Sequence, residues 1–320
     1  MRYNVRMIIV EILAPIILIV VLGTVLRHSG FASEAFFRET NRLVYWIALP
    51  GFLFLKTSQA TPQFGAAARV FAALVAGMAA CIVLGLLAGR LLRLERPSLA
   101  SFVQGAYRSN LAYVGLPIVI YALAAMGQDT PETEAVALLA IAPLIPVYNV
   151  VAVLVLLSGR QDRSLSLTRQ AGMLAQGVAT NPLIIACVAG VAFAYTGWVM
   201  PLAVERALEA IGQMALPLAL LGIGATLRAW AIREGGIPAL ASAVIKTAVA
   251  PLVGYMLARA FRLSSVETLM VLLYIAMPTA VMSYVMAERL GADGRLAGSI
   301  VVMSTLLALP ALAVILLSVT

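Results

Sequence analysis

A polar segment interrupts an apolar stretch of the chain at residues 108–117, "RSNLAYVGLP". Ser109, Asn110 and Tyr113 could hydrogen-bond a ligand there, and Gly115 and Pro117 weaken a helix. Proline removes a backbone donor and clashes with the preceding turn, and glycine relaxes the backbone. We expect a helix broken at Gly115–Pro117, with its polar residues beside the break.

A counterpart occurs at residues 277–283, "MPTAVMS", where Pro278 is followed by Thr279 and Ser283. A helix that restarts after such a break directs free N–H groups and the positive end of its dipole towards the break. Two such breaks at one depth favour an anion. The alternative is that Pro117 and Pro278 only kink packed helices, as many transmembrane prolines do.

Two basic residues lie within apolar segments. Lys246, in "ASAVIKTAVAPLVGY", is one of only two lysines in the chain. A cation at the bilayer centre is costly and usually marks a pathway or a partner. Lys246 is either a counter-charge for an anionic substrate or a structural partner of a carboxylate or of helix C-terminal carbonyls. Arg108 could pair with a carboxylate or extend to the membrane interface.

Acidic residues are absent beside the two breaks. Asp129, Asp162 and Asp293 fall in connecting segments, and Glu11 alone is expected within a span. This pattern disfavours cation or proton exchange as the main activity. Glu11 is either a coupling carboxylate or an interfacial residue. Arg108, Glu11 and Asn149 are candidates for coupling or gating.

No metal site or cofactor motif is recognisable, and no nucleophile motif indicates an enzyme. Lys246 and Ser109 could form a Ser–Lys pair, but nothing in the sequence brings them within reach of each other.

Composition defines the class of protein. Of the 320 residues, 62% are hydrophobic and 11% are charged, and the mean hydropathy is +1.01. Soluble domains are about 45–50% apolar and about 25% charged. The chain is therefore predicted to be an all-α polytopic membrane protein. Ten spans are expected at 7–26, 41–58, 67–91, 99–126, 135–157, 174–196, 203–228, 236–261, 266–288 and 295–319.

Arginine distribution predicts the orientation. If both termini lie outside, most basic residues fall in cytoplasmic segments, as the positive-inside rule requires. The formal net charge of +8 reflects this bias and gives no case for nucleic acid.

The chain repeats itself with a nearly constant offset. Pro15, Gly23, Gly30 and Pro50 recur 167 residues later as Pro182, Gly190, Gly197 and Pro217. Each repeat, 1–158 and 170–320, holds five spans, and an odd number inverts the second copy. Inverted repeats with interrupted helices are common in secondary transporters, which bind substrate near the midplane. We expect the broken helices 4 and 9 to cross there.

Several segments resemble the auxin efflux carrier family, which includes plant auxin exporters and bacterial permeases for malate or malonate. The resemblance runs in order over nearly the whole chain, through "LPGFLF", "YRSNLAYVGLPI", "TNPLIIACVAGV", "VIKTAVAPLVG", "MPTAVMSYVMAERLGAD" and "VVMSTLLALPAL". The long cytosolic loop of many plant members is absent, because spans five and six are joined by the short segment 158–173. This departure argues against a plant-type role and suits a bacterial permease.

The resemblance implies a scaffold (about 1–62 and 174–230) and a mobile transport unit (about 65–158 and 235–320) that moves like an elevator. It implies a substrate carboxylate near Asn110, a bacterial cytoplasmic membrane as the location, and leaves a homodimer through the scaffold open. The candidate substrate-binding residues are Ser109, Asn110, Tyr113, Gly115, Pro117, Lys246, Pro278, Thr279 and Ser283.

The favoured function is secondary transport of a small organic anion, with a proton, sodium or no ion as the coupling partner. One alternative is a sodium-coupled symporter of the bile-acid type, although no oxygen-rich cluster lies beside the second break. Another is a membrane sensor that does not transport.

Overall fold

The computed structural model describes residues 5–59, 63–159, 179–226 and 234–319, together with residues 168, 169, 172, 175 and 176. The side chains of residues 5–13, 16, 216 and 319 lie outside this description. Regular structure within the described part is helical, so the all-α prediction is confirmed.

The described part of the first half of the chain forms helices and two π-helical turns. They are α1 (Val5–His28), α2 (Glu34–Leu43), η1 (Val44–Ala48), α3 (Leu49–Gln59), α4 (Phe64–Leu91), α5 (Arg96–Tyr107), η2 (Leu111–Gly115), α6 (Leu116–Ala125), α7 (Pro131–Ile141) and α8 (Leu144–Ser158).

The second half repeats this pattern and contains the third π-helical turn. Its elements are α10 (Pro182–Thr196), α11 (Leu202–Gln213), α12 (Ala215–Thr226), α14 (Gly236–Val244), η3 (Ile245–Val249), α15 (Ala250–Ala260), α16 (Ser265–Ala276), α17 (Met282–Arg289) and α18 (Gly294–Val319).

Membrane-spanning character is clear in these helices. Five helical stretches among the described residues are long and apolar enough to cross a membrane, and shorter apolar helices accompany them. The prediction of a multi-pass membrane protein is thereby confirmed.

The first break lies earlier than the sequence predicted. Helix α5 ends at Tyr107, and the helix restarts at Leu111. Gly115 and Pro117 do not break it, because Gly115 closes the π-helical turn η2 and Pro117 occupies the first turn of α6. Proline is tolerated in a first turn, where its missing N–H has no intrahelical partner. The second break, between Ala276 and Met282, contains Pro278 as expected.

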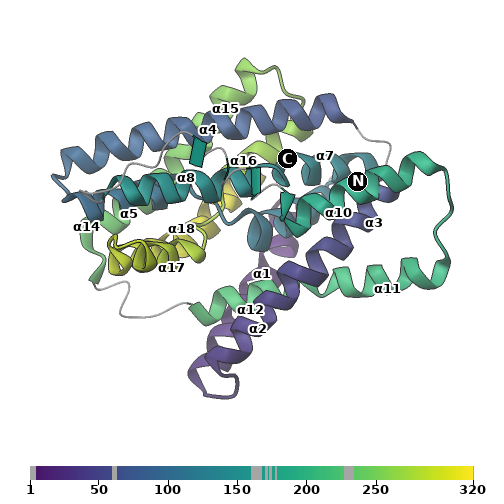
Figure 1. Ribbon diagram of the computed structural model, residues 1–320, viewed down its shortest axis with the longest axis horizontal. Helices are drawn as coiled ribbons and strands as arrows, with labels where there is room; N and C mark the ends of the chain where they lie inside the picture. Colours follow the sequence, from purple (N-terminus) through teal and green to yellow (C-terminus); the bar gives the residue numbers. More distant parts are fainter. Residues whose placement is uncertain are drawn as a thin grey trace.

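Figure 1 shows two groups of helices. Helices α3, α10 and α11 lie on its right, and α1, α2 and α12, which pack on one another, lie in its lower middle part. We call these, with η1, the first helix group. Helices α4–α8 and α14–α18, with η2 and η3, form the second helix group, in which α5 packs on α4, α8, α14 and α18.

Matched turns in the two halves share an unusual geometry. Arg93 and Arg262 follow α4 and α15 with φ of 54° and 52°, a region that residues other than glycine rarely adopt. The same backbone hydrogen bond caps both helix C-termini. Leu94 N donates to Gly89 O at 3.0 Å, and Leu263 N donates to Ala258 O at 2.9 Å. Gly30 and Gly197, and Gly127 and Gly291, also pair as positive-φ positions at the predicted offsets.

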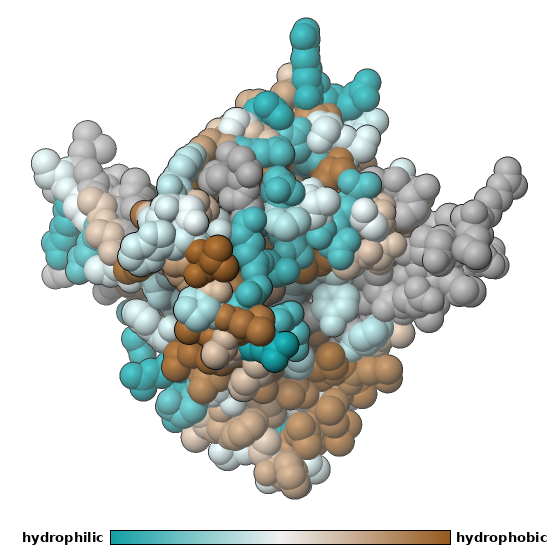
Figure 2. All heavy atoms as spheres, turned by 90° about the vertical axis from the view of Figure 1, so that its right-hand side faces the viewer, coloured by the Kyte–Doolittle hydropathy of each residue, from teal (hydrophilic) through white to brown (hydrophobic). Residues whose placement is uncertain are grey.

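The outer surface carries many large apolar side chains, such as Leu18, Val188 and Leu252. Figure 2 shows one face on which hydrophobic residues cover the lower part and hydrophilic residues gather above them. Such an exposed apolar area is suited to contact with lipid.

Glycines bring backbones into contact inside the first helix group. A Cβ on Gly224 would lie 1.9 Å from Val20 O, and one on Gly23 would lie 2.2 Å from Leu221 O. Thr24 Oγ1 also donates to Gly224 O at 2.9 Å. Small residues allow this close packing of transmembrane helices.

We expect Gly224→Ala to lower the free energy of unfolding by about 1–3 kcal/mol, because the added methyl group forces α1 and α12 apart. Thermal unfolding followed by size-exclusion chromatography measures this effect. The matched control is Gly65→Ala, where a Cβ has open space except for Arg69 Nη1 at 4.0 Å. Equal stability of the two variants would contradict the packing account.

Candidate functional site

The two breaks lie against each other and pair as short extended segments. Ser109 and Thr279 form an isolated antiparallel bridge. Asn110 N donates to Pro278 O at 2.9 Å, and Ala280 N donates to Arg108 O at 3.0 Å. Backbone groups that would be unsatisfied in lipid therefore satisfy each other.

Thr279 fixes this pair to the surrounding helices. Its Oγ1 donates to Gly105 O of α5 at 2.8 Å, and its N–H donates to Ser304 Oγ of α18 at 3.0 Å. The side chain is only 1% exposed. Thr279 therefore holds the two breaks in register.

Lys246 lies behind the paired breaks. Its side chain is 1% exposed, and Nζ donates to Ser109 Oγ at 2.7 Å and to Ile275 O at the end of α16. The predicted alternatives for Lys246 included contact with helix C-terminal carbonyls, and this contact is present. The structure thus brings Lys246 and Ser109 together, which the sequence could not show.

This contact does not make a Ser–Lys catalytic pair. A general base needs an amine that accepts a proton, whereas Nζ serves two acceptors as a donor. The Ser109 hydroxyl is also hydrogen-bonded to Tyr148, so it lies between Lys246 and the cavity lining.

A cavity of about 370 Å³ opens beside the paired breaks. The residues that begin both restarting helices line it: Asn110–Tyr113 of the first and Ala280–Met282 of the second. The first N–H groups of a helix have no intrahelical partner, so both positive helix ends face this space. No Asp or Glu is among the residues that line it.

Arg108 lines the cavity as its nearest cation. Nη2 donates to Asn149 Oδ1 at 2.7 Å, Nη1 donates to Ser283 Oγ at 3.5 Å, and the residue is 4% exposed. No carboxylate of the described residues pairs with Arg108, and its burial does not fit a side chain that extends to the membrane interface. Asn149 holds the guanidinium against the cavity.

Asn110 and Tyr113 also line the cavity. Tyr113 Oη donates to Asn41 O of α2 at 3.4 Å. The side-chain amide of Asn110 has no hydrogen-bond partner within the described residues, although the residue is only 5% exposed. An amide so placed is available to a ligand.

Ser109 lines the cavity as well, whereas the remaining predicted substrate-binding residues do not. Gly115, Pro117, Pro278, Thr279, Ser283 and Lys246 are buried around it. A Cβ on Gly115 would lie 3.1 Å from the ring of Tyr274, so its glycine serves close packing rather than a break. Glu11 lies in α1, but its side chain is outside the described part.

The first helix group supplies cavity residues that the sequence did not single out. They are Asn41 and Tyr45 from α2 and η1, and Ala219, Gly222 and Ile223 from α12; Tyr148 of α8 was also missed. A polar residue, Asn41, near the start of the second predicted span was the one sequence feature that could have indicated this part of the cavity. The three π-helical turns hold Tyr45, Tyr113 and Lys246, which line the cavity or lie behind it. Such turns often mark functional sites.

A vestibule of about 600 Å³ leads to the cavity. The two spaces share Asn41, Tyr45, Tyr113, Gly222, Val281, Met282 and Val285. The vestibule is lined by three arginines, Arg27, Arg38 and Arg42, and by Glu34. Its net positive lining attracts anions towards the cavity.

Metal and thiol chemistry have no support here. No group of three or more His, Cys, Asp or Glu residues within the described ranges could hold a metal ion. Cys81 and Cys187 are free and buried.

An all-helical membrane protein with a polar cavity at paired helix breaks is typical of transporters. A family model described as "membrane transport protein" matches residues 8–316, so the chain belongs to this family, the auxin efflux carrier family that its motifs resemble. The family is one of transporters, not enzymes. No curated protein matches the chain in a sequence comparison.

We expect Thr279→Val to lower the free energy of unfolding by about 1–3 kcal/mol, because the buried Gly105 carbonyl loses its donor. Thermal unfolding of purified protein measures this. The control is Thr305→Val, whose hydroxyl bonds only Val301 O of its own helix. If both variants melt at the same temperature, Thr279 does not hold the breaks together.

Proposed function

We propose that this protein is a secondary transporter of a small organic anion, a carboxylate, which binds in the cavity beside the paired breaks. The observation that carries the proposal is the charge of that cavity. Two positive helix ends and Arg108 face it, and Lys246 lies behind Ser109, with no acid in the lining. The anion supplies the missing counter-charge.

The proposed contacts follow from the free hydrogen-bond donors. Asn110 offers an unpartnered amide, and Arg108 retains N–H groups beyond those bound to Asn149 and Ser283. Lys246 donates to Ser109, which is also bonded to Tyr148, so the buried Nζ adds positive potential behind the cavity lining. Charge-assisted hydrogen bonds to carboxylate are stronger than neutral ones.

The cavity walls suit an apolar substrate body. Tyr45, Tyr113 and Tyr148 line it together with Ile145 and Ile223. Its volume lies at the lower end of the range of about 300–1,000 Å³ for small-molecule sites.

We propose alternating access through an elevator-like movement of the second helix group against the first. These groups correspond to the expected transport unit and scaffold. The repeated turns at Arg93 and Arg262 support two inverted repeats of five spans each. The cavity opens through the arginine-lined vestibule, which we place on the cytoplasmic side because of its basic residues.

The remaining assignments of location and assembly also belong to this proposal. They are a bacterial cytoplasmic membrane, both termini outside, a homodimer through the first helix group, and a proton, sodium or no coupling ion. Sodium coupling is the alternative mechanism, and a sensor that binds without transport is the alternative function.

Arg108→Gln is expected to weaken carboxylate binding about 10- to 100-fold, because a charged hydrogen bond contributes about 1.5–3 kcal/mol. Asn110→Ala is expected to weaken it about tenfold. Carboxylate-dependent thermal shifts of the purified variants report the affinities. The control Arg289→Gln removes the same charge from an exposed position of α17. Unchanged affinity in Arg108→Gln and Asn110→Ala would refute the site.

Flux measurements separate the mechanisms. We expect a stabilising carboxylate to cross the membrane of proteoliposomes that contain the wild-type protein, and Arg108→Gln to abolish this flux. Stabilisation that requires sodium would favour the sodium-coupled alternative. Binding without flux would favour the sensor.

A further inference from the structure

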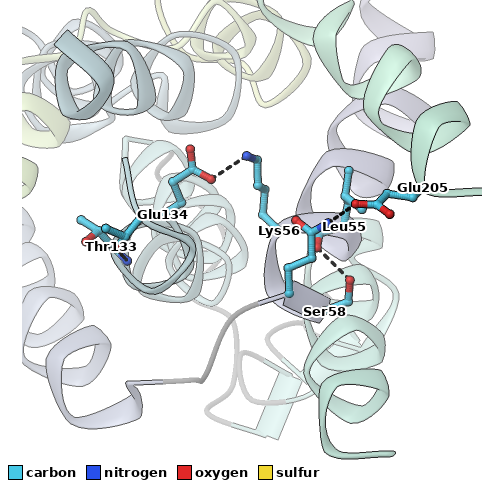
Figure 3. Close-up of polar contacts among 8 residues, drawn as sticks. Leu55, Lys56, Ser58, Thr133, Glu134 and Glu205 are labelled. Atoms are coloured by element: carbon cyan, nitrogen blue, oxygen red, sulfur yellow. Dashed lines mark hydrogen bonds and ion pairs between the residues drawn. The ribbon is translucent and has the colours of Figure 1, made fainter. Parts of the chain in front are cut away.

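An ion pair joins the two helix groups at one end of α3. Lys56 Nζ of α3 lies 2.8 Å from Glu134 Oε2 of α7. Figure 3 shows the two side chains reaching towards each other from separate helices.

The other ion pairs in the described ranges stay within one helix group. Arg27–Glu34 joins α1 to α2, Arg42–Glu39 lies within α2, and Arg69–Glu267 joins α4 to α16. Lys56–Glu134 alone among these four connects the first group to the second. Relative movement of the groups must therefore break or distort this pair.

Both partners are fixed on their own helix group. Gln59 Nε2, one turn after Lys56, donates to Glu205 Oε1 of α11 at 2.8 Å. Lys56 Nζ lies 5.7 Å from the centre of the Phe52 ring, which favours the cation there. On the other side, Glu134 lies in the first turn of α7, where the helix dipole favours a carboxylate.

Burial makes the pair asymmetric. The Glu134 side chain is 6% exposed, whereas that of Lys56 is 30% exposed. Separation would leave Lys56 partly hydrated but would deprive a buried carboxylate of its counter-ion, which is costly. The pair thus favours the arrangement in which the groups are together at this end.

The pair lies at the end opposite the vestibule. Arg42 lines the vestibule, and the helical path from Arg42 through η1 to Lys56 is continuous. At 1.5 Å per residue this path covers about 20 Å. The cavity meets the vestibule at the arginine end, and the ion pair joins the two helix groups at the other end.

We propose that Lys56–Glu134 is a latch that stabilises the vestibule-open state and must separate before the opposite end opens. The inference rests on the proposed alternating access between the two helix groups. It assigns Lys56 and Glu134 a role in conformational equilibrium and none in contacting the substrate.

The test measures how often the latched end opens. Leu53, one turn before Lys56 and 1% exposed, is replaced by cysteine as a reporter, with Cys81→Ala and Cys187→Ala removing the native thiols. A second reporter, Val285→Cys, lines both the cavity and the vestibule. Maleimide labelling rates of purified protein are then compared with and without Glu134→Gln.

We expect Glu134→Gln and Lys56→Met each to raise the labelling rate at Leu53→Cys about threefold, the size expected for a partly exposed ion pair, without raising it at Val285→Cys. The exchanged pair Lys56→Glu with Glu134→Lys should restore the original rate. The matched control Glu267→Gln breaks a pair inside the second group and should leave both rates unchanged.

Three outcomes would overturn the latch. They are an unchanged rate at Leu53→Cys in Glu134→Gln, a failure of the exchanged pair to restore it, or an equal effect of Glu267→Gln. A rise at both reporters with a lower melting temperature would show that the pair only stabilises the fold. Because labelling needs no substrate, failure of carboxylate binding would refute the proposed function separately.

Discussion

The backbone pairing of residues 108–110 with 278–280 is the constraint on which the rest of the site depends. A helix that stops inside a bilayer exposes polar groups that lipid cannot satisfy. Here two interrupted segments satisfy each other through Asn110 N to Pro278 O and Ala280 N to Arg108 O. The pairing fixes where both helices restart, and so it fixes the direction of their positive ends and the position of the cavity.

Two buried cations add positive charge near the cavity. Arg108 is held by Asn149 and Ser283, and Lys246 is held by Ser109 and the Ile275 carbonyl. Neither has a carboxylate partner among the described ion pairs. Desolvated charges of one sign raise the local potential far more than surface charges do, because little water screens them. Under the proposed function, a bound anion neutralises this potential.

Sequence alone predicted the helical class, the second break and the polar residues near both breaks, because apolar length and proline act locally. It misplaced the first break at Gly115–Pro117. Proline in the first turn of a new helix looks the same in sequence as proline that ends one, and only Tyr107 and Leu111 as observed helix ends distinguish the two cases. Lys246 contacts segments that are distant in the sequence, and so do Asn41 and Tyr45 where they line the cavity. No local sequence pattern indicates such long-range contacts.

Close approach at glycine has a mechanical consequence. Gly23, Gly190 and Gly224 bring backbone against backbone within the first helix group. Wherever a glycine in the described ranges has near neighbours, they belong to its own helix group. Interlocked backbones resist shear, whereas flexible side chains at a boundary can exchange partners. Among the described residues these close glycine contacts lie within the groups and not between them, so the proposed movement would not have to separate them.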